Sequence, residues 1–506
     1  MPKSPWFNED HELFRQSVRQ FIDTEVFPEA ASWEKQGFIP TSMWTRMGEL
    51  GLLGVPHKEE DGGLGADFFH SVILLEEVAR STMGGFSAAV SVHMYMATAH
   101  IAKVGSPVLK EKFLRPAITG EKWGALGISE PFAGSDVASI RTTAVREGDH
   151  YVINGSKTFI TNGVEGDFVT LACKTDPDAG AAGISLIIVE KGTPGFTASN
   201  LDKMGWHSSD TGELAFDDVR VPVENLVGQE NQGFYYIMDS FQLERLVAAA
   251  LAIGGAEKAI EMAMQYMDER EVFGRKINRF QALRHRLVDR LTELEAARQL
   301  TYFTAWKHEQ GDFAVRECSM AKLLTAELGK KVADDCLQVF GGYGFMEEYP
   351  IARMYRDARA GTIVGGTSEI MREILAKMTF DGVRYDSAYE EGGDQTNITA
   401  RDIMLGLPER FRTEKAASAD AIFHFDLAGD GGGKFTVAVK PDGCSVQEGL
   451  SGEAACTISA ASMDYVALEQ GRLDPQAALM GGKIKVSDMG AMMSFMPLFH
   501  GLQKAS

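Results

Sequence analysis

The hydrophobic pattern of this 506-residue chain changes its period along the sequence, and these changes constrain the fold more than any other feature. Near the start, apolar side chains recur at helical spacing, as Phe14, Val18 and Ile22 do. Further on, apolar runs such as Ile184–Val189 become short and β-branched, with Asn-Gly and Pro-Gly pairs between them, which is typical of strands and turns. From Gly233 onwards long helical patterns return. This order of helices, strands and helices predicts an α–β–α unit.

A second, smaller unit is predicted towards the C-terminal end. The segment Tyr389–Asp394 is acidic, contains glycine and has almost no large apolar residues, which is typical of a linker. Beyond it, Phe423–Leu427 and Phe435–Val439 alternate between apolar and polar residues, and Gly431–Gly433 separates them, so a β-hairpin is predicted. Four methionines between Met489 and Met496 recur at helical spacing and indicate either a core face or an adaptable apolar groove.

Length and charge limit the classes of function. A chain of 506 residues predicts two to four domains. The formal net charge of -21 argues against nucleic-acid binding, which relies on basic patches. No apolar run reaches the ~20 residues that a membrane helix needs, and the first residues show no signal or transit pattern. We therefore expect a cytoplasmic protein with no membrane span.

The five cysteines are scattered along the chain. None forms a CxxC pair or a metal-ligand spacing with histidine, so we expect reduced thiols and no bound metal. They are Cys173, Cys318, Cys336, Cys444 and Cys456.

Two polar segments of the middle part contain glycine. The local chemistry of Gly127–Asp136 fits a surface turn before a capped helix, and it also fits a cradle for a flat cofactor. In Asn154–Gly163, Phe159 and Thr161 stand two residues apart, so both side chains point to one side of a strand. The residues alone leave the choice between a turn and a cofactor site open.

In the helical stretch Asp239–Leu246, Glu244 is the carboxylate that follows Phe241. By their spacing, Phe241, Glu244 and Arg245 share one helical face with two alanines. An exposed Glu–Arg pair on an ordinary helix is one interpretation. The other is a catalytic base, because a carboxylate binds a proton more readily once water is excluded from its surroundings.

Together these segments resemble those of the acyl-CoA dehydrogenases, and of the long-chain branch in particular. The likeness extends from about Trp6 to Met378 and includes further motifs in the family's order. These are Lys203–Trp206, Phe216–Pro222, Gly233–Met238, Tyr349–Arg359 and Gly365–Glu369. The implied architecture is an α-helical N-terminal domain in 1–123, a middle β-sheet or barrel domain in 124–232, a C-terminal four-helix bundle in 233–380 and a linker in 381–398.

The resemblance also implies FAD as the cofactor. The residues expected at the isoalloxazine ring and the near end of FAD are Ile128, Ser129, Gly134 and Ser135. Phe159, where many relatives have Trp, is expected against the flavin, and Thr161 is expected to hydrogen-bond it. Thr367 and Glu369 are expected as further contacts from the same chain.

A neighbouring subunit is expected to complete this FAD site. The guanidinium of Arg270 would meet the pyrophosphate, for which its forked donors are suited. The other residues expected to reach across are Phe273, Gln281, Gln338, Gly341 and Gly342. A shared site implies at least a homodimer, and the family implies a homotetramer.

The resemblance places the catalytic base on the helix. Most relatives carry it in the loop at the position of Gly365, whereas long-chain and isovaleryl-CoA dehydrogenases carry it at the position of Glu244 and keep a small residue in the loop. This chain has the second arrangement at both positions, so Glu244 is the expected base. The expected substrate-binding residues are Ser135, Phe241, Arg245, Gly365 and Gly366.

The C-terminal part, 399–506, resembles a sterol carrier protein 2-like (SCP2-like) domain, which is a small α+β fold. The two strands of the predicted hairpin and the stretch Gly471–Val486 carry this likeness. It implies an apolar cavity for a fatty acyl chain or a sterol, in a non-catalytic role.

The expected activity is the oxidation of a long-chain acyl-CoA to its trans-2-enoyl-CoA in fatty-acid β-oxidation, with electrons passing to an electron-transfer flavoprotein. Two alternatives stay open. One is an acyl-CoA oxidase or another flavin oxygenase on the same scaffold. The other is a catalytically inactive lipid-binding protein.

Overall fold

The computed structural model describes residues 5–385, 387, 399–416, 419–429, 431–469, 478–479 and 482–500. The chain forms two compact units, Met1–Tyr389 and Glu390–Ser506. The predicted linker segment Tyr389–Asp394 lies outside the described residues, and so do residues 471–477, 480 and 481 of the C-terminal motif. Among the helices that are described, none has both the length and the apolar character that a membrane crossing requires.

The first unit begins with helices. They are α1 (Glu9–Phe21), α2 (Ala30–Gln36), α3 (Thr41–Glu49), α4 (Phe68–Ala79), α5 (Gly84–Val92), η5 (His93–Ala97), α6 (Thr98–Val104), α7 (Pro107–Leu109) and α8 (Arg115–Ile118). The apolar face predicted for the first helix is confirmed, because Val18, Phe21 and Ile22 are buried in one core with residues of α3 and α4.

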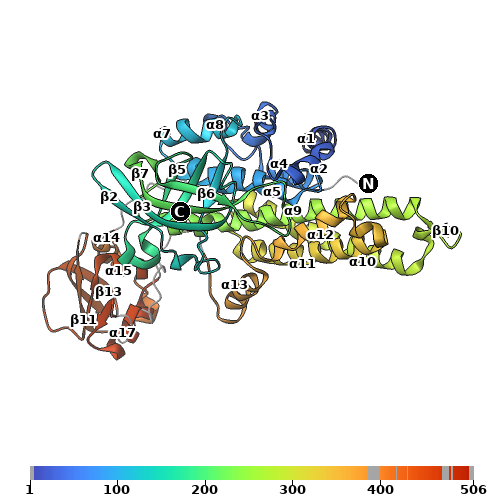
Figure 1. Cartoon of the computed structure of the whole chain (residues 1–506). Helices are drawn as coiled ribbons and strands as arrows, with labels where there is room; N and C mark the ends of the chain where they lie inside the picture. The colour runs from blue at the N-terminus through green and yellow to red at the C-terminus, as the bar shows by residue number, and fades with distance from the viewer. Residues whose placement is uncertain are drawn as a thin grey trace. The chain divides into compact units, whose positions relative to one another are not determined.

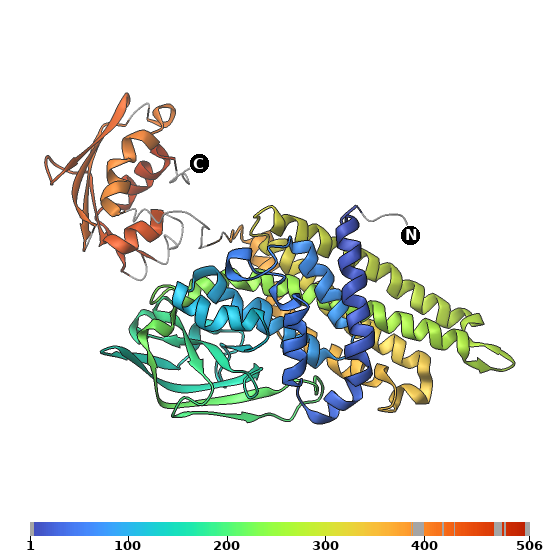
Figure 2. The ribbon, with the colours of Figure 1, turned by 90° about the horizontal axis from the view of Figure 1, so that it is seen from above.

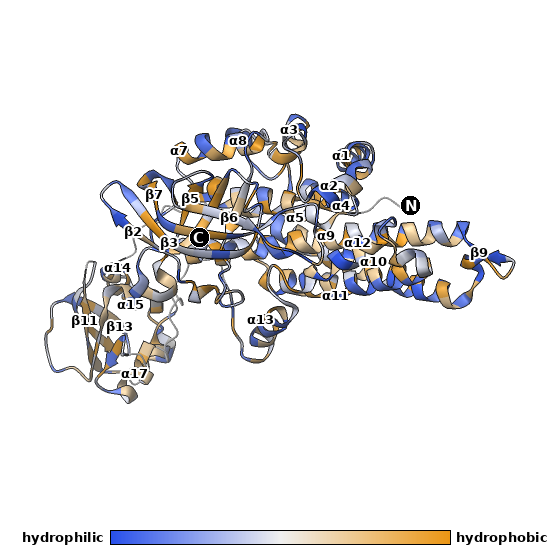
Figure 3. Ribbon diagram, in the orientation of Figure 1, coloured by the Kyte–Doolittle hydropathy of each residue, from blue (hydrophilic) through white to orange (hydrophobic). Residues whose placement is uncertain are grey.

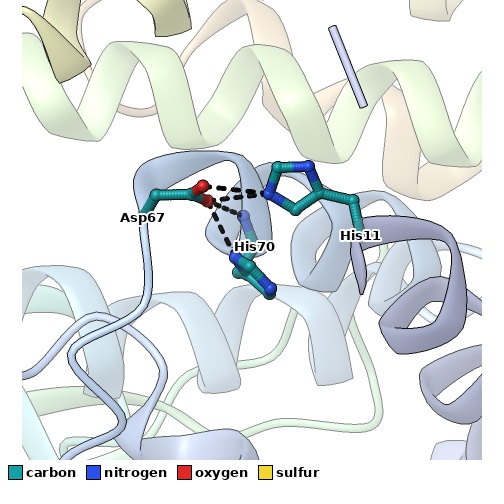
Figure 4. Close-up of side chains that lie close together, drawn as sticks. All are labelled: His11, Asp67 and His70. Carbon is teal, nitrogen blue, oxygen red and sulfur yellow. Dashed lines mark hydrogen bonds and ion pairs between the residues drawn. The ribbon is translucent and has the colours of Figure 1, made fainter. Parts of the chain in front are cut away.

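A polar cluster joins α1 to the start of α4 (Figure 4). The carboxylate of Asp67 lies 3.0 Å from Nε2 of His11 and 2.7 Å from Nδ1 of His70, and it also accepts a bond from the His70 backbone N–H. Nδ1 of His11 accepts the backbone N–H of Asn8, so its proton is on Nε2, where it is donated to Asp67. A metal ion would need that nitrogen without its proton. The geometry therefore fits a helix-capping cluster rather than a metal site.

The middle of the unit is an open sheet. Its strands are β1 (Gly124–Gly127), β2 (Thr143–Glu147), β3 (His150–Thr161), β4 (Phe168–Lys174), β5 (Ile184–Glu190), β6 (Phe196–Asn200), β7 (Thr211–Pro222) and β8 (Leu226–Val227). They follow the order β6-β7-β3-β2-β4-β5-β8, and β1 pairs with β4 in parallel. Figure 3 shows β5 mostly in the hydrophobic colour and β2 mostly in the hydrophilic one. Of the two predicted forms, the sheet is confirmed and the closed barrel is not formed.

Long helices complete the unit. They are α9 (Gly233–Glu269), α10 (Gln281–Glu309), α11 (Val315–Phe340), η11 (Gly341–Phe345), α12 (Pro350–Ala358), η12 (Ala360–Thr362) and α13 (Ser368–Phe380), with the short hairpin β9 (Glu271–Val272) and β10 (Arg275–Lys276) between α9 and α10. The bundle predicted here is confirmed, because α9, α10 and α11 pack on one another and α13 packs on α11.

Helix α9 runs through the whole of this unit. At 37 residues it is about 55 Å long, at 1.5 Å per residue. It crosses α4 at Gly254, where an added Cβ would lie 2.0 Å from the carbonyl oxygen of Glu76, so only glycine allows this contact. Figures 1 and 2 place the sheet near the first turns of α9 and the β9–β10 hairpin at its far end.

The second unit is a small α+β fold. Its elements are α14 (Ala400–Leu405), β11 (Ala421–Ala428), β12 (Gly433–Lys440), β13 (Gly443–Glu448), β14 (Cys456–Ala461), α15 (Ser462–Glu469), β15 (Ile484–Val486) and α17 (Met489–Phe495). The strands follow the order β13-β12-β11-β14-β15, in which β11 and β14 are parallel. The predicted hairpin is confirmed as the antiparallel pair β11–β12.

The methionine face of α17 is only partly in the core. Met492 packs against the core of the second unit, together with residues of β11 and β12. Met489, Met493 and Met496 are exposed, however, and Met493 keeps 64% of its surface. The interpretation of the methionine face as a core face is therefore wrong for three of its four methionines.

Candidate active site

The carboxylate of Glu244 lies on α9 in an almost closed apolar environment. The residue is 6% exposed, and its Oε1 has no hydrogen-bond partner among the described residues. Burial raises the pKa of Glu244 to about 7, and the neighbouring charge of Arg245 offsets part of that rise. The exposed Glu–Arg pair that the sequence left open does not form. Glu244 is instead a buried, unsatisfied carboxyl group that can take up a proton near neutral pH.

The neighbours of Glu244 come from the same helix. Arg245 is also buried, and its Nη1 donates to Oε1 of Gln242 over 2.7 Å, while its Nε has no partner in the described part of the chain. Burial lowers the pKa of Arg245. Phe241 is half-buried and packs in one apolar cluster with Ile128, which brings this turn of α9 against the segment that follows β1.

The Gly365–Gly366 turn lies close to this pair of charges. Both glycines have positive φ, +61° and +87°, and a Cβ added at Gly365 would meet nothing within 4 Å. Lys322 on α11 donates a hydrogen bond to the carbonyl of Gly366, and the charge of Arg245 acts on the same ammonium. Glu244 and Gly365, the two positions that can carry the family's base, are thus connected through the charges of Arg245 and Lys322 and the hydrogen bond from Lys322 to Gly366. The space that a Cβ at Gly365 would occupy is free of other described protein atoms.

The segment after β1 is fixed to β3. The N–H of Thr158 donates to the carbonyl of Ser129 over 2.9 Å. Lys157 is fully buried, and its Nζ bonds the carbonyl of Ile128 at 3.0 Å and Oε1 of Glu130 at 2.8 Å. The predicted residues of this segment are therefore held beside those of β3.

A bulge in β3 presents the predicted flavin wall. The register against β7 shifts between Lys157 and Ile160, and Phe159 has a φ of +62° with 72% of its surface exposed. Thr161, two residues further along β3, is half-buried. Gly134 and Ser135 are exposed, and a Cβ at Gly134 would meet nothing within 4 Å. An exposed aromatic beside an open glycine segment fits a flat ring system.

Thr367 and Glu369, the other two residues expected to contact FAD from the same chain, lie at the start of α13. The hydroxyl of Thr367 caps α13 by accepting the N–H of Ile370 over 3.2 Å. Glu369 follows it on the surface, 3.9 Å from Arg372, and its side chain is 80% exposed. Glu369 is therefore no rival to Glu244 as a buried base.

A second group of predicted FAD residues meets at the far end of α9. A cavity of about 550 Å³ is lined by Arg270, Gln338, Gly341 and Gly342, together with apolar side chains of α9 and α11. Cβ atoms at the two glycines would meet nothing within 4 Å, so the backbone is open to a ligand.

The other two members of that group stand outside the cavity lining. Phe273 has a φ of +50° and is 92% exposed at the tip of the β9–β10 hairpin, and Gln281 is exposed at the start of α10. An aromatic ring with so little cover in one chain is suited to a contact with another molecule.

The two groups of predicted FAD residues lie far apart in a single chain. Arg270 follows Glu244 by 26 positions along α9, which is about 39 Å at 1.5 Å per residue. Figures 1 and 2 show the sheet near the first turns of α9 and the β9–β10 hairpin at the opposite end of the helix. In one chain, Glu244 and the cavity around Arg270 therefore lie near opposite ends of α9.

Three consecutive parts of the chain match descriptions of one protein family. Residues 8–121, 125–219 and 231–380 match the family descriptions "Acyl-CoA dehydrogenase, N-terminal domain", "middle domain" and "C-terminal domain". The chain is 40% identical over 374 residues to the long-chain specific acyl-CoA dehydrogenase of Sus scrofa, which covers 73% of this chain and 86% of that protein.

The chain belongs to the acyl-CoA dehydrogenase family. It is an FAD-dependent oxidoreductase of that family, with an SCP2 domain in its C-terminal part, because residues 407–500 match the SCP-2 sterol transfer family. The short-chain specific acyl-CoA dehydrogenase of Clostridium acetobutylicum is also 40% identical, over 372 residues, 73% of this chain and 98% of that one. Overall identity therefore does not separate long-chain from short-chain acyl-CoA dehydrogenases here.

A solved structure shows the same fold. The acyl-CoA dehydrogenase of Geobacillus kaustophilus superimposes with a TM-score of 0.71 at 42% identity and covers 74% of this chain and 99% of its own.

Sequence reasoning missed two lysines of this acyl-CoA dehydrogenase. Lys157 and Lys322 are both fully buried next to predicted site residues. A signal for Lys322 was present, since it stands four residues after Cys318 and four before Ala326, on the face of α11 that is buried. Lysine is rarely buried, so the apolar spacing around it does not by itself predict a buried ammonium group.

Proposed function

We propose that this chain catalyses the α,β-dehydrogenation of an acyl-CoA to its trans-2-enoyl-CoA, with Glu244 as the base that removes the α proton. The observation that supports this most is the burial of Glu244: it raises the pKa of this carboxyl group to about 7, and Oε1 has no hydrogen-bond partner among the residues that the structure describes. A base with a pKa near the working pH combines ionisation with proton affinity, which favours proton abstraction.

The surrounding residues have complementary roles in this proposal. Glu244 takes the proton from the carbon next to the thioester, and the Arg245 guanidinium keeps part of the carboxyl group ionised at neutral pH. Phe241 and Ile128 form apolar cover that excludes water. Gly365 leaves room for the thioester. Bound FAD supplies the hydride acceptor, and Phe159 and Thr161 are suited to hold its ring beside the substrate.

A long acyl chain is the proposed substrate class. A cavity of about 250 Å³ lies beside α9 and is lined by Leu243, Tyr95, Phe68 and Pro56 among others. Leu243 directly precedes Glu244 on α9, and we propose that this cavity takes an acyl chain whose thioester lies at the base. Serine and tyrosine hydroxyls from Ser71 and Tyr95 line it as well.

Assembly and partners follow from the same proposal. FAD would be held by Ser129, Ser135 and their neighbours in one chain and by the cavity around Arg270 in a second, so the active form is a homodimer or a homotetramer. Electrons would leave to an electron-transfer flavoprotein, in the cytoplasm. We further propose the boundaries 1–123, 124–232, 233–380, 381–398 and 399–506 for its three dehydrogenase domains, linker and SCP2 domain.

The SCP2 domain is proposed to bind a fatty acyl chain or a sterol. Its support is the apolar core between sheet and helices, together with the exposed methionines Met489, Met493 and Met496, which suit an adaptable apolar surface. Uptake of a fluorescent fatty acid by the full chain, weakened in Met493→Glu and unchanged in Glu453→Gln on an exposed loop of the same unit, would support the role.

Substrate and acceptor are tested in one experiment. The purified yellow protein is supplied with acyl-CoAs whose chains have about 4 to 18 carbons. The enoyl-CoA product is measured twice, once with an electron-transfer flavoprotein as the acceptor and once with oxygen alone. The proposal predicts the highest kcat/KM for long chains and little peroxide in air. Stoichiometric peroxide would favour the oxidase alternative, and product from none of the acyl-CoAs would favour an inactive lipid-binding protein.

A further inference from the structure

Lys322 is a buried cation that no step of the proposed reaction uses. Its side chain lies on α11 and is 1% exposed. Burial, and after it the like charge of Arg245, lowers the pKa of Lys322 to about 8. A buried ammonium group loses the solvation of water, so a lysine at this position needs a compensating contact.

The compensating contact is with the backbone of the site loop. Nζ of Lys322 donates a hydrogen bond to the carbonyl of Gly366. Glu327 and Glu369 act on Lys322 only through their charge, since in the described part of the chain their ion pairs are with Lys330 and Arg372. The ammonium is therefore directed at the turn rather than at a carboxylate.

The conformation of this turn depends on such contacts. Gly365 and Gly366 are consecutive residues with positive φ. Glycine adopts positive and negative φ about equally easily, so these two residues do not by themselves hold the turn in one conformation. On its C-terminal side the turn is fixed by Thr367, which caps α13. On its other side, α11 packs against η12 and α13, and the side chain of Lys322 donates a hydrogen bond to the turn itself.

We propose that Lys322 is a positioning residue: by holding the Gly366 carbonyl, it keeps the Gly365–Gly366 turn in the open conformation that admits the acyl thioester beside Glu244. This inference rests on the proposed function. The charged groups that face Lys322 are Arg245 on α9, Glu327 on α11 and Glu369 on α13. Arg245 is itself next to Glu244, so the same ammonium adds positive potential where the base must ionise.

Three variants test the role of Lys322. Lys322→Met removes the donor, Lys322→Arg keeps a charge that does not titrate, and Lys331→Met on the exposed face of the same helix is the matched control. Affinity for a trans-2-enoyl-CoA is measured by calorimetry, alongside KM, kcat and the melting temperature. We expect Lys322→Met to weaken enoyl-CoA binding and raise KM by about 10- to 100-fold, because a small misplacement at a reacting centre has effects of this size.

The pH dependence separates positioning from a general loss of structure. In the wild type, activity should fall as the pH rises through about 8, where Lys322 loses its charge. Lys322→Arg should bind enoyl-CoA and should lack this fall. An Arg variant with the wild-type alkaline limb, or a Met variant equal to Lys331→Met in binding and KM, would overturn the proposal. If Lys322→Met does not fold, the pH comparison of wild type with Lys322→Arg decides.

Failure of this inference differs from failure of the proposed function. Glu244→Gln is measured in parallel. If that variant still reduces the flavin, the proposed base is wrong, whatever the Lys322 variants do. If Glu244→Gln is inactive while Lys322→Met binds enoyl-CoA like the wild type, only the role of Lys322 is overturned.

Discussion

The ammonium of Lys157 lies 2.8 Å from Oε1 of Glu130, and both side chains are buried beneath the segment that fits the flavin ring. Glu130 also accepts the backbone N–H groups of Arg141 and Thr142, at 2.6 and 3.0 Å. Burial alone would raise the pKa of Glu130, but Lys157 and these bonds hold it below its usual value. Through its bonds to Ile128 on one side and to Arg141 and Thr142 on the other, this ion pair holds the chain before and after the segment.

Breaking this pair should loosen FAD as well as the fold. Removing one partner of a buried pair leaves an unpaired charge, which costs about 3 kcal/mol. We expect Lys157→Met to lower the free energy of unfolding by about that amount and to lose FAD on gel filtration. Glu147→Gln, which removes an exposed pair with Arg220 on the same sheet, should change stability by less than about 1 kcal/mol. If both variants keep FAD equally well, the pair does not hold the cofactor segment.

The shared FAD site can be tested by complementation. Arg270→Ala should impair the half-site at the far end of α9, and Glu244→Gln the half-site with the base. Each variant alone should be inactive. Oligomers that contain both chains should regain activity, because an intact Glu244 then meets an intact Arg270 of the other chain. Activity that stays absent in mixed oligomers would show that each chain builds its site alone.

The buried carboxyl of Glu244 should make stability depend on pH. Its pKa is raised to about 7 in the folded chain, so the fold favours the protonated form. This contribution is fully present below the ordinary glutamate pKa of about 4.3 and is lost as the pH rises through about 7. Glu244→Gln should therefore be more stable than wild type at pH 8 and similar at pH 4. The difference should be at most about 4 kcal/mol, at about 1.4 kcal/mol per pKa unit. Denaturant unfolding at both pH values measures it, and a difference independent of pH would contradict the assigned pKa.

Asp67 should matter as a helix cap and not as a metal ligand. Asp67→Ala removes the α4 cap and both imidazole contacts, so we expect a loss of about 1–2 kcal/mol in stability. Adding EDTA or zinc should leave the melting temperature of the wild type unchanged. A zinc-dependent rise that Asp67→Ala abolishes would instead establish a metal site at His11, Asp67 and His70.

The sequence predicted the elements better than it predicted their contacts. The periodicity of Phe14–Ile22 and the Phe423–Val439 hairpin were readable because local patterns determine them. The positive φ of Phe159 was not, since a bulge between β3 and β7 produces it. The burial of Lys322 was also hidden, because it depends on how α11 packs against a distant turn. The resemblance to the acyl-CoA dehydrogenases identified Glu244 as the candidate base, and the structure showed that it is buried beside Arg245.

The most direct test of the account is anaerobic flavin reduction by a long-chain acyl-CoA, comparing wild type with Glu244→Gln. The wild type should lose its yellow colour. The Gln variant should bind the same acyl-CoA, seen as a shift in the flavin spectrum, but reduce the flavin about 100- to 10,000-fold more slowly, which is the range that general-base catalysis contributes. Equal rates of bleaching in the two proteins would show that the α proton is removed by another group.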